Sequence, residues 1–213
     1  MKLRSATATK NWSISSSSND LKNIFKNEIN VAIQNRDISH LSNEINNLLK
    51  LDINIKLKGN AKTIFKEINN LIDSDVNTLV LKDIEYLLLL FSELTNSQDL
   101  HLYLATINTN MCRRFHADNN DLRLLCTYSG PGTIWLTQNN INLKALNSYK
   151  SNESIVIDKS KIQQAKTGSV VILKGSKFHK TSNNAAVHKS PSIENLNQKR
   201  LLLRLDTDRF LNF

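Results

Sequence analysis

Residues 114–136, RFHADNNDLRLLCTYSGPGTIWL, place a histidine and an aspartate two positions apart, just before a strand-like run that closes with Gly-Pro-Gly. Side chains alternate faces in an extended segment, so His116 and Asp118 are predicted to point to one side and Ala117 to the other. An imidazole and a carboxylate with a common direction form part of a site, and a third group is needed to complete a metal centre.

The residues after 100 have the pattern of a β domain. Apolar and polar residues alternate there with a period of two, which predicts strands over 101–107, 122–128, 133–136, 154–157, 168–173, 185–188 and 200–205. Before residue 100 the period is mainly helical, over 21–33, 41–49, 61–72 and 81–94, while 50–58 fits either a strand or the end of a helix. Helices followed by many short strands predict an antiparallel sandwich or roll with a helical cover.

The positive charge of the chain lies in its second half. Residues 1–100 hold 12 Lys/Arg and 12 Asp/Glu, whereas residues 101–213 hold 16 against 7, which accounts for the whole net charge of +9. An electropositive module attracts anions, so the partner is predicted to be a small anionic cosubstrate. A solvated basic surface explains the same charge equally well. Nucleic acid ranks last, because no Lys/Arg cluster with interleaved aromatic residues is present.

The N-terminal residues and the cysteines indicate the cellular compartment. Residues 1–18 are basic and Ser/Thr-rich like an organellar transit peptide, but the composition favours a disordered tail. Only two cysteines are present, Cys112 and Cys126, so no disulfide framework is indicated and the cytoplasm is the predicted compartment. No apolar run is long enough to span a membrane.

Two histidines are candidates for the third ligand of the His116/Asp118 pair. His188 ends the short apolar run Ala-Ala-Val and precedes a Lys-Ser-Pro turn, which would fix its ring at a strand end. His179 lies in a lysine-rich loop, where a solvated or substrate-facing role is more natural. We therefore predict that His116, Asp118 and His188 hold the metal, with His179 as the alternative to His188.

The strand over 200–205 supplies an anion-binding candidate. Arg200, Arg204 and Asp206 share one face of that strand, together with Leu202. A buried arginine can bind a carboxylate through two parallel hydrogen bonds, which a lysine cannot do. The order His-x-Asp, His, Arg over residues 112–205 resembles that of the iron and 2-oxoglutarate dependent oxygenases.

A closer resemblance rests on longer motifs, CRRFHAD at 112–118, RLLCTYSGPGTIW at 123–135, VILKG at 171–175, VHKSP at 187–191 and RLLLRLD at 200–206. They resemble a bacterial family known only as a domain of unknown function. The resemblance implies an α+β fold with a double-stranded β-helix (jelly-roll) core. The expected domains are a disordered tail over 1–18, an N-terminal helical cover over 19–100 and the double-stranded β-helix over 101–213.

These observations predict an Fe(II) and 2-oxoglutarate dependent dioxygenase of unknown substrate. Arg200, or alternatively Arg204, would bind the distal carboxylate of 2-oxoglutarate, and Tyr128 and Lys174 are further cosubstrate-binding candidates. The alternative function is a non-oxidising β-roll that handles or senses zinc through the same ligands, with Cys112 as an added candidate, because zinc readily takes His and Asp ligands. Binding of 2-oxoglutarate distinguishes the two functions, because a protein that only handles zinc has no reason to bind it.

Several other motif residues have a structural explanation beside the functional one. Gly130-Pro131-Gly132 is predicted to form a tight turn between strands, or alternatively a backbone rim close to the metal. Tyr128 is also a candidate for a half-buried core position, and Trp135 for the core or the pocket wall.

Overall fold

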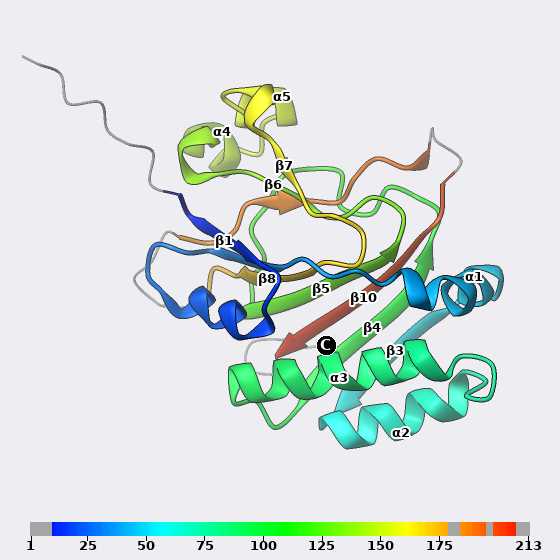
Figure 1. The fold of residues 1–213 in the computed structure, drawn as a ribbon. Helices are drawn as coiled ribbons and strands as arrows, with labels where there is room; N and C mark the ends of the chain where they lie inside the picture. The colour runs from blue at the N-terminus through cyan, green and yellow to red at the C-terminus, as the bar shows by residue number, and fades with distance from the viewer. Residues whose placement is uncertain (1–9, 179–183, 195–197, 208–213) are drawn as a thin grey trace, which may run out of the picture.

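The computed structural model describes residues 10–178, 184–194 and 198–207. Within these residues seven strands form one main sheet, and three short strands form a second one, here called the minor sheet. Figure 1 shows the main sheet crossing the molecule, with long helices on one side of it and the minor sheet on the other. None of the described helices combines the length and the apolar character that crossing a bilayer requires.

The main sheet has the spatial order β1-β2-β8-β5-β10-β4-β3. Strands β1 and β2 pair in parallel, and all other neighbouring strands of this sheet pair antiparallel. The bounds are β1 Trp12–Ser15, β2 Val31–Gln34, β3 Asn54–Gly59, β4 Leu100–Ile107, β5 Leu122–Ser129, β8 Val170–Lys174 and β10 Arg200–Thr207. The last long strand, β10, therefore lies in the sheet between β5 and β4, which brings the C-terminal motif beside the central one.

The minor sheet is built from β7 Gln163–Gln164, β6 Ile134–Trp135 and β9 His188–Lys189, in that order. Short helical turns connect its strands: η3 Gln138–Asn140, α4 Leu143–Asn147, α5 Asn152–Ile155 and η4 Lys159–Lys161. Trp135 of β6 packs in one hydrophobic cluster with Leu125 of β5 and Val171 of β8. The minor sheet is thus fastened to one face of the main sheet by apolar burial.

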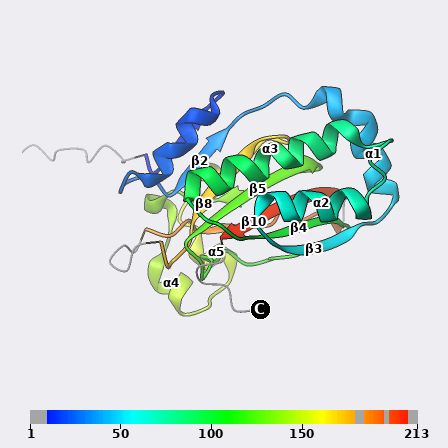
Figure 2. The ribbon, with the colours of Figure 1, turned by 90° about the horizontal axis from the view of Figure 1, so that it is seen from below.

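The opposite face of the main sheet carries the long helices. Their bounds are α1 Ser42–Lys50, α2 Ala61–Leu71 and α3 Thr78–Thr95, with the shorter turns η1 Ser18–Phe25 and η2 Ser39–Leu41. Leu87 and Phe91 of α3 belong to the same buried cluster as Leu203 and Leu205 of β10. Figure 2 shows α2 and α3 lying along this face. Successive side chains of a strand point to opposite faces of the sheet. Leu203 and Leu205 of β10 therefore face the helices, whereas Leu202 faces the minor sheet.

Most of the expected elements form, and three differ. Of the strand expected over 185–188, only His188 lies in a strand, β9. The segment 21–33, expected as a helix, forms the turn η1 and then strand β2, whose four residues are all buried. A strand buried on both faces reads as a continuous apolar run, which periodicity cannot separate from a buried helix. Of the strand expected over 154–157, the first two residues belong to the helix α5, which follows Ser151 as its N-cap, and Val156 forms only an isolated bridge with Ile141.

The fold class is confirmed as a mixed α+β fold with a large, mainly antiparallel sheet, but the sheet does not close on itself. In the described residues β1 and β3 form its edges. A purely helical cover is not confirmed either, because β1, β2 and β3 all come from the residues before 100. The division of the chain at residues 18 and 100 stays a prediction.

Candidate functional site

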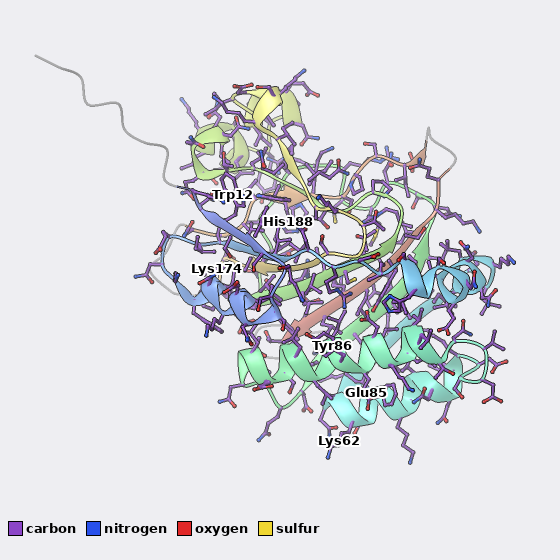
Figure 3. The ribbon with its side chains drawn as sticks, in the orientation of Figure 1. Trp12, Lys62, Glu85, Tyr86, Lys174 and His188 are labelled. Atoms are coloured by element: carbon purple, nitrogen blue, oxygen red, sulfur yellow. The ribbon has the colours of Figure 1, made fainter. Side chains whose placement is uncertain are left out.

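The two histidines of the predicted metal site are neighbours through the backbone. His116, in the connection between β4 and β5, forms an antiparallel bridge with His188 of β9. The His116 N–H donates to the His188 carbonyl at 3.0 Å, and the His188 N–H donates to the His116 carbonyl at 2.9 Å. Directly opposed residues project to the same side, so the two rings lie with their centroids 4.7 Å apart. Figure 3 shows His188 above the main sheet, on the side of the minor sheet.

Each of these imidazoles has one nitrogen tied to the backbone. His116 Nδ1 lies 2.9 Å from the Arg114 carbonyl oxygen, and His188 Nδ1 lies 3.1 Å from the Ala186 carbonyl oxygen. A carbonyl only accepts hydrogen bonds, so both Nδ1 atoms carry the proton in a neutral ring and both Nε2 atoms are left as lone-pair donors. This is the arrangement found at histidines that bind metals.

Asp118 lies against both free nitrogens. Its Oδ1 is 3.5 Å from His116 Nε2, and its Oδ2 is 3.3 Å from His188 Nε2. The three ligand atoms lie within 4.8 Å of one another. Two imidazole nitrogens and one carboxylate gathered in this way match the facial triad of mononuclear non-haem iron sites.

The charges around Asp118 keep it ionised. Burial alone would raise the pKa of this carboxyl group, but His188, His116 and Arg123 together hold it well below its usual range. The same contact with Asp118 raises the pKa of His116 to about 10. The pKa of His188 is lowered, chiefly because that ring is buried. The site therefore offers one carboxylate and one imidazole that favours its neutral form.

A buried ion network connects Asp118 to the main sheet. Arg123 of β5 donates from NH1 to Asp118 Oδ2 at 2.5 Å and from Nε to Asp206 Oδ1 at 2.6 Å. Asp206 of β10 is fully buried and also accepts from Asn120 at 2.9 Å. Arg123 was not predicted as a site residue, although strand alternation from Thr127 places it on the cavity side of β5.

A cavity beside the triad contains the predicted anion-binding arginine. Its lining includes His116, His188, Arg123, Thr133, Arg200 and Arg204. Arg200 is 1% exposed, and its guanidinium donates to Thr127 Oγ1 at 3.1 Å. Burial lowers the pKa of Arg200 to about 10. Within the described part of the chain, no carboxylate pairs with this arginine, and its Nε has no hydrogen-bond partner.

The other predicted site residues lie in different surroundings. The Tyr128 hydroxyl donates to Asp83 of α3 at 2.7 Å, so it faces the helices and not the cavity. The Lys174 ammonium donates to the Lys26 carbonyl at 2.7 Å, next to η1. Arg204 lines the cavity, but its Nε lies 3.0 Å from Asp206. The alternative ligand His179 lies outside the described residues.

The Gly-Pro-Gly turn lies against the cavity arginine. Gly130 has φ +80°, and a Cβ placed on it would lie 2.7 Å from Arg200 Cγ and 2.8 Å from the Lys199 carbonyl oxygen. Both the backbone conformation and the space therefore require glycine here. Trp135, which pairs with His188 between β6 and β9, is buried in the cluster between the sheets.

A family model described as "Protein of unknown function (DUF1826)" matches residues 15–206 of the chain. The chain belongs to the DUF1826 family. The match spans the minor sheet, the main sheet apart from most of β1, all the long helices and the predicted site. No curated protein sequence matches this DUF1826 chain.

Solved structures with a similar fold include two dioxygenases and a protein described as a putative oxygenase. The rice dioxygenase for auxin oxidation has a TM-score of 0.56 and 10% identity, over 89% of this chain and 76% of that one. The 2-oxoglutarate complex of the dioxygenase for auxin oxidation 1 from Arabidopsis thaliana has a TM-score of 0.53 and 9% identity, over 94% of each chain. A putative oxygenase from Shewanella oneidensis has a TM-score of 0.52 and 13% identity, over 92% of this chain and 89% of that one. At these identities the likeness shows the fold alone.

Proposed function

We propose that this DUF1826 protein is an Fe(II) and 2-oxoglutarate dependent oxygenase. The observation that carries the proposal is that the two histidines of a His-Asp-His facial set line the same cavity as a buried arginine without a described acidic partner. Each feature alone has a structural explanation, but their combination supplies both a metal site and a counter-charge for an acid. The Arabidopsis neighbour, which is a 2-oxoglutarate complex on a similar fold, supports the choice of cosubstrate.

In this proposal His116 and His188 bind iron through Nε2, and Asp118 binds it through a carboxylate oxygen. The backbone carbonyls of Arg114 and Ala186 fix the orientation of the two rings. Arg123 holds the Asp118 carboxylate in place from the main sheet. Iron bound there supplies dioxygen activation coupled to oxidative decarboxylation of the 2-oxo acid.

Arg200 is assigned to the distal carboxylate of 2-oxoglutarate. The described residues around the buried Arg200 guanidinium include no acidic partner. An anionic ligand would stabilise this guanidinium, because the ligand would offset the cost of burying an unpaired charge. The Thr127 hydroxyl restrains the guanidinium, and Leu125 and Leu202 line the same cavity as apolar walls. Arg204 is a weaker candidate, since it already pairs with Asp206.

One observation favours a second candidate function, a zinc-handling protein. Cys112 lines the same cavity, and a hydrogen bond that its sulfur accepts from His116 lowers the pKa of the Cys112 thiol. A thiolate beside two imidazoles and a carboxylate is a donor set that zinc accepts. Such a protein has no use for 2-oxoglutarate, so the buried Arg200 favours the oxygenase. A cytoplasmic location stays a prediction from the sequence.

The test is an anaerobic titration of the purified protein with Fe(II) and then 2-oxoglutarate, followed by visible absorption. We expect the weak charge-transfer band of an iron complex chelated by a 2-oxo acid. His116→Ala should abolish the band, whereas His40→Ala, which removes an exposed histidine of η2, should keep it. Iron binding without any effect of 2-oxoglutarate would reject the oxygenase and favour zinc handling.

A further inference from the structure

A row of side chains leads across the main sheet from the proposed metal site to the sheet edge. Residues opposite one another on neighbouring strands project from the same face. The register pairs Asp206 with Arg123 between β10 and β5, His101 with Asp206 between β4 and β10, and Lys58 with His101 between β3 and β4. Since Arg123 also contacts Asp118, this face connects the proposed metal ligand to the edge strand β3.

The neighbouring row on the same face stacks two cations on one aromatic ring. Lys56 of β3 is opposite Tyr103 of β4, which is opposite Arg204 of β10. The Lys56 ammonium lies 5.8 Å from the centroid of the Tyr103 ring, and the Arg204 guanidinium carbon lies 5.2 Å from it. A half-buried ring is therefore flanked by positive charge on both sides.

These two rows line a groove of about 300 Å³, whose lining includes Lys56, Lys58, His101, Tyr103 and Arg204. None of the described residues that line it is acidic. Arg204 also lines the cavity of the proposed metal site, so the groove and that cavity adjoin. The volume is within the range of small-molecule sites.

We propose that this groove binds the substrate of the oxygenase, and that the substrate is a small molecule with a carboxylate or phosphate group on an apolar body. The inference rests on the proposed function. Lys56 and Lys58, both exposed on β3, bind the anionic group, and the ring of Tyr103 packs against the apolar body. The nearby Asp206 does not cancel the charge of Lys56, because the Asp206 carboxylate is fully buried and paired with two arginines. A small molecule fits better than a nucleic acid, since the groove has the size of a single ligand.

The experiment measures binding of phenyl phosphate, 4-phenylbutyrate and uncharged 2-phenylethanol to the full chain by ligand-observed NMR. We expect both aryl anions to bind and the alcohol not to bind. The double variant Lys56→Gln/Lys58→Gln should raise the Kd of the anions about fivefold, because two partly exposed ion pairs are lost. The matched control Lys62→Gln/Lys66→Gln removes two exposed lysines of α2, which lies away from His188 in Figure 3, and should leave the Kd unchanged.

The results of these binding measurements distinguish between the possible ligands of the groove. A tighter Kd for phenyl phosphate assigns a phosphate group to the substrate, and a tighter Kd for 4-phenylbutyrate assigns a carboxylate. An unchanged Kd in the Lys56/Lys58 variant overturns the proposal, since the anions then bind elsewhere, for example at Arg200. An equal loss in the control variant overturns it in favour of a merely basic surface. Binding of a single-stranded oligonucleotide through Lys56 and Lys58, without binding of the aryl anions, overturns it in favour of nucleic acid.

A second measurement separates this inference from the function on which it rests. In Mn(II)-loaded protein, the protons of the bound aryl anion should relax faster, because the groove adjoins the metal site. Mn(II) binding without faster relaxation overturns the groove as a substrate site. If Mn(II) does not bind at all, the proposed metal-dependent function is overturned instead. The change in anion Kd in the Lys56/Lys58 variant would then still test whether the groove binds anions.

Discussion

Arg200 combines a cost to stability with a use in binding. The side chain is fully buried, and the described residues supply it with a threonine hydroxyl and no carboxylate. A buried charge without a partner lowers the free energy of unfolding, and apolar replacements at such positions are often neutral or stabilising. The proposed anionic ligand, and not the fold, would therefore explain why an arginine is retained there.

Replacing Arg200 by methionine should separate these two effects. We expect an unchanged or higher Tm, because the desolvation cost disappears. The Kd of 2-oxoglutarate should rise about 10- to 100-fold, since charge-assisted hydrogen bonds are worth roughly 1.5–3 kcal/mol. Thermal unfolding and an anaerobic 2-oxoglutarate titration measure the two quantities. Arg113→Met, at a side chain 71% exposed, is the matched control, and a lower Tm in Arg200→Met alone would contradict the argument.

Gly130 should be sensitive to a single added carbon. Gly130→Ala forces a residue with a Cβ into a left-handed conformation and against Arg200, so we expect a loss of about 1–3 kcal/mol in the free energy of unfolding. The displaced arginine should also weaken 2-oxoglutarate binding. Urea unfolding and the same titration test both effects, with Ser129→Ala as the neighbouring control. Wild-type affinity in Gly130→Ala would show that the turn does not position Arg200.

At the scale of elements, β5 serves both layers of the molecule. Its cavity face carries Arg123 and Thr127, and its helix face carries Cys126 and Tyr128. Asp83 of α3 accepts from the Tyr128 hydroxyl at 2.7 Å and forms an ion pair with Arg36 at 2.7 Å. Burial raises the pKa of the Cys126 thiol to about 12. Strand β5 is thus attached to helix α3 by a buried polar contact behind the site.

The buried Tyr128 phenol should make stability fall at alkaline pH. Its pKa is raised well above 10 by burial, so above pH 10 the unfolded chain loses a proton that the folded chain keeps, and the free energy of unfolding decreases as pH rises. Tyr128→Phe should flatten this decrease and should cost about 1 kcal/mol at neutral pH, where only the hydrogen bond is lost. Urea unfolding between pH 8 and about 11 measures it. Tyr86→Phe, on the exposed side of α3, is the control (Figure 3). Parallel pH profiles for wild type and Tyr128→Phe would contradict this explanation.

At the scale of the whole molecule, the proposed metal site joins the two sheets. His188 belongs to the minor sheet, whereas Asp118 is held by Arg123 of the main sheet, which also pairs with Asp206. An ion bound by these ligands would cross-link the layers without an additional covalent bond. Metal binding is therefore expected to act on global stability and not only on the local geometry.

Mn(II) should raise the Tm of the wild-type protein. At 100 times Kd, a ligand that binds only the folded state adds about 2.7 kcal/mol, which corresponds to roughly 5–10 °C for a chain of this size. Thermal unfolding with Mn(II), and again after a chelator is added, measures the shift and its reversal. His116→Ala should lose the shift, while His40→Ala should keep it. An equal shift in His116→Ala would place the metal elsewhere.

Local patterns in the sequence predicted the residues of the proposed site. Two-residue spacing aligned His116 with Asp118, and strand alternation placed Arg200 and Arg204 on one face, because both depend only on local backbone geometry. The distant ligand His188 was predicted from its context at a strand end. Alternation also showed that only one of Thr127 and Tyr128 faces the cavity, but not which one.

The contacts that each of these residues makes follow from long-range packing. It turned Tyr128 toward Asp83, tied Lys174 to the backbone near η1 and joined Arg123 to Asp118. It also made 31–34 a buried strand and left the main sheet open. Which face of a strand is buried, and which strand lies beside it, depends on long-range packing, so no local pattern contains that information.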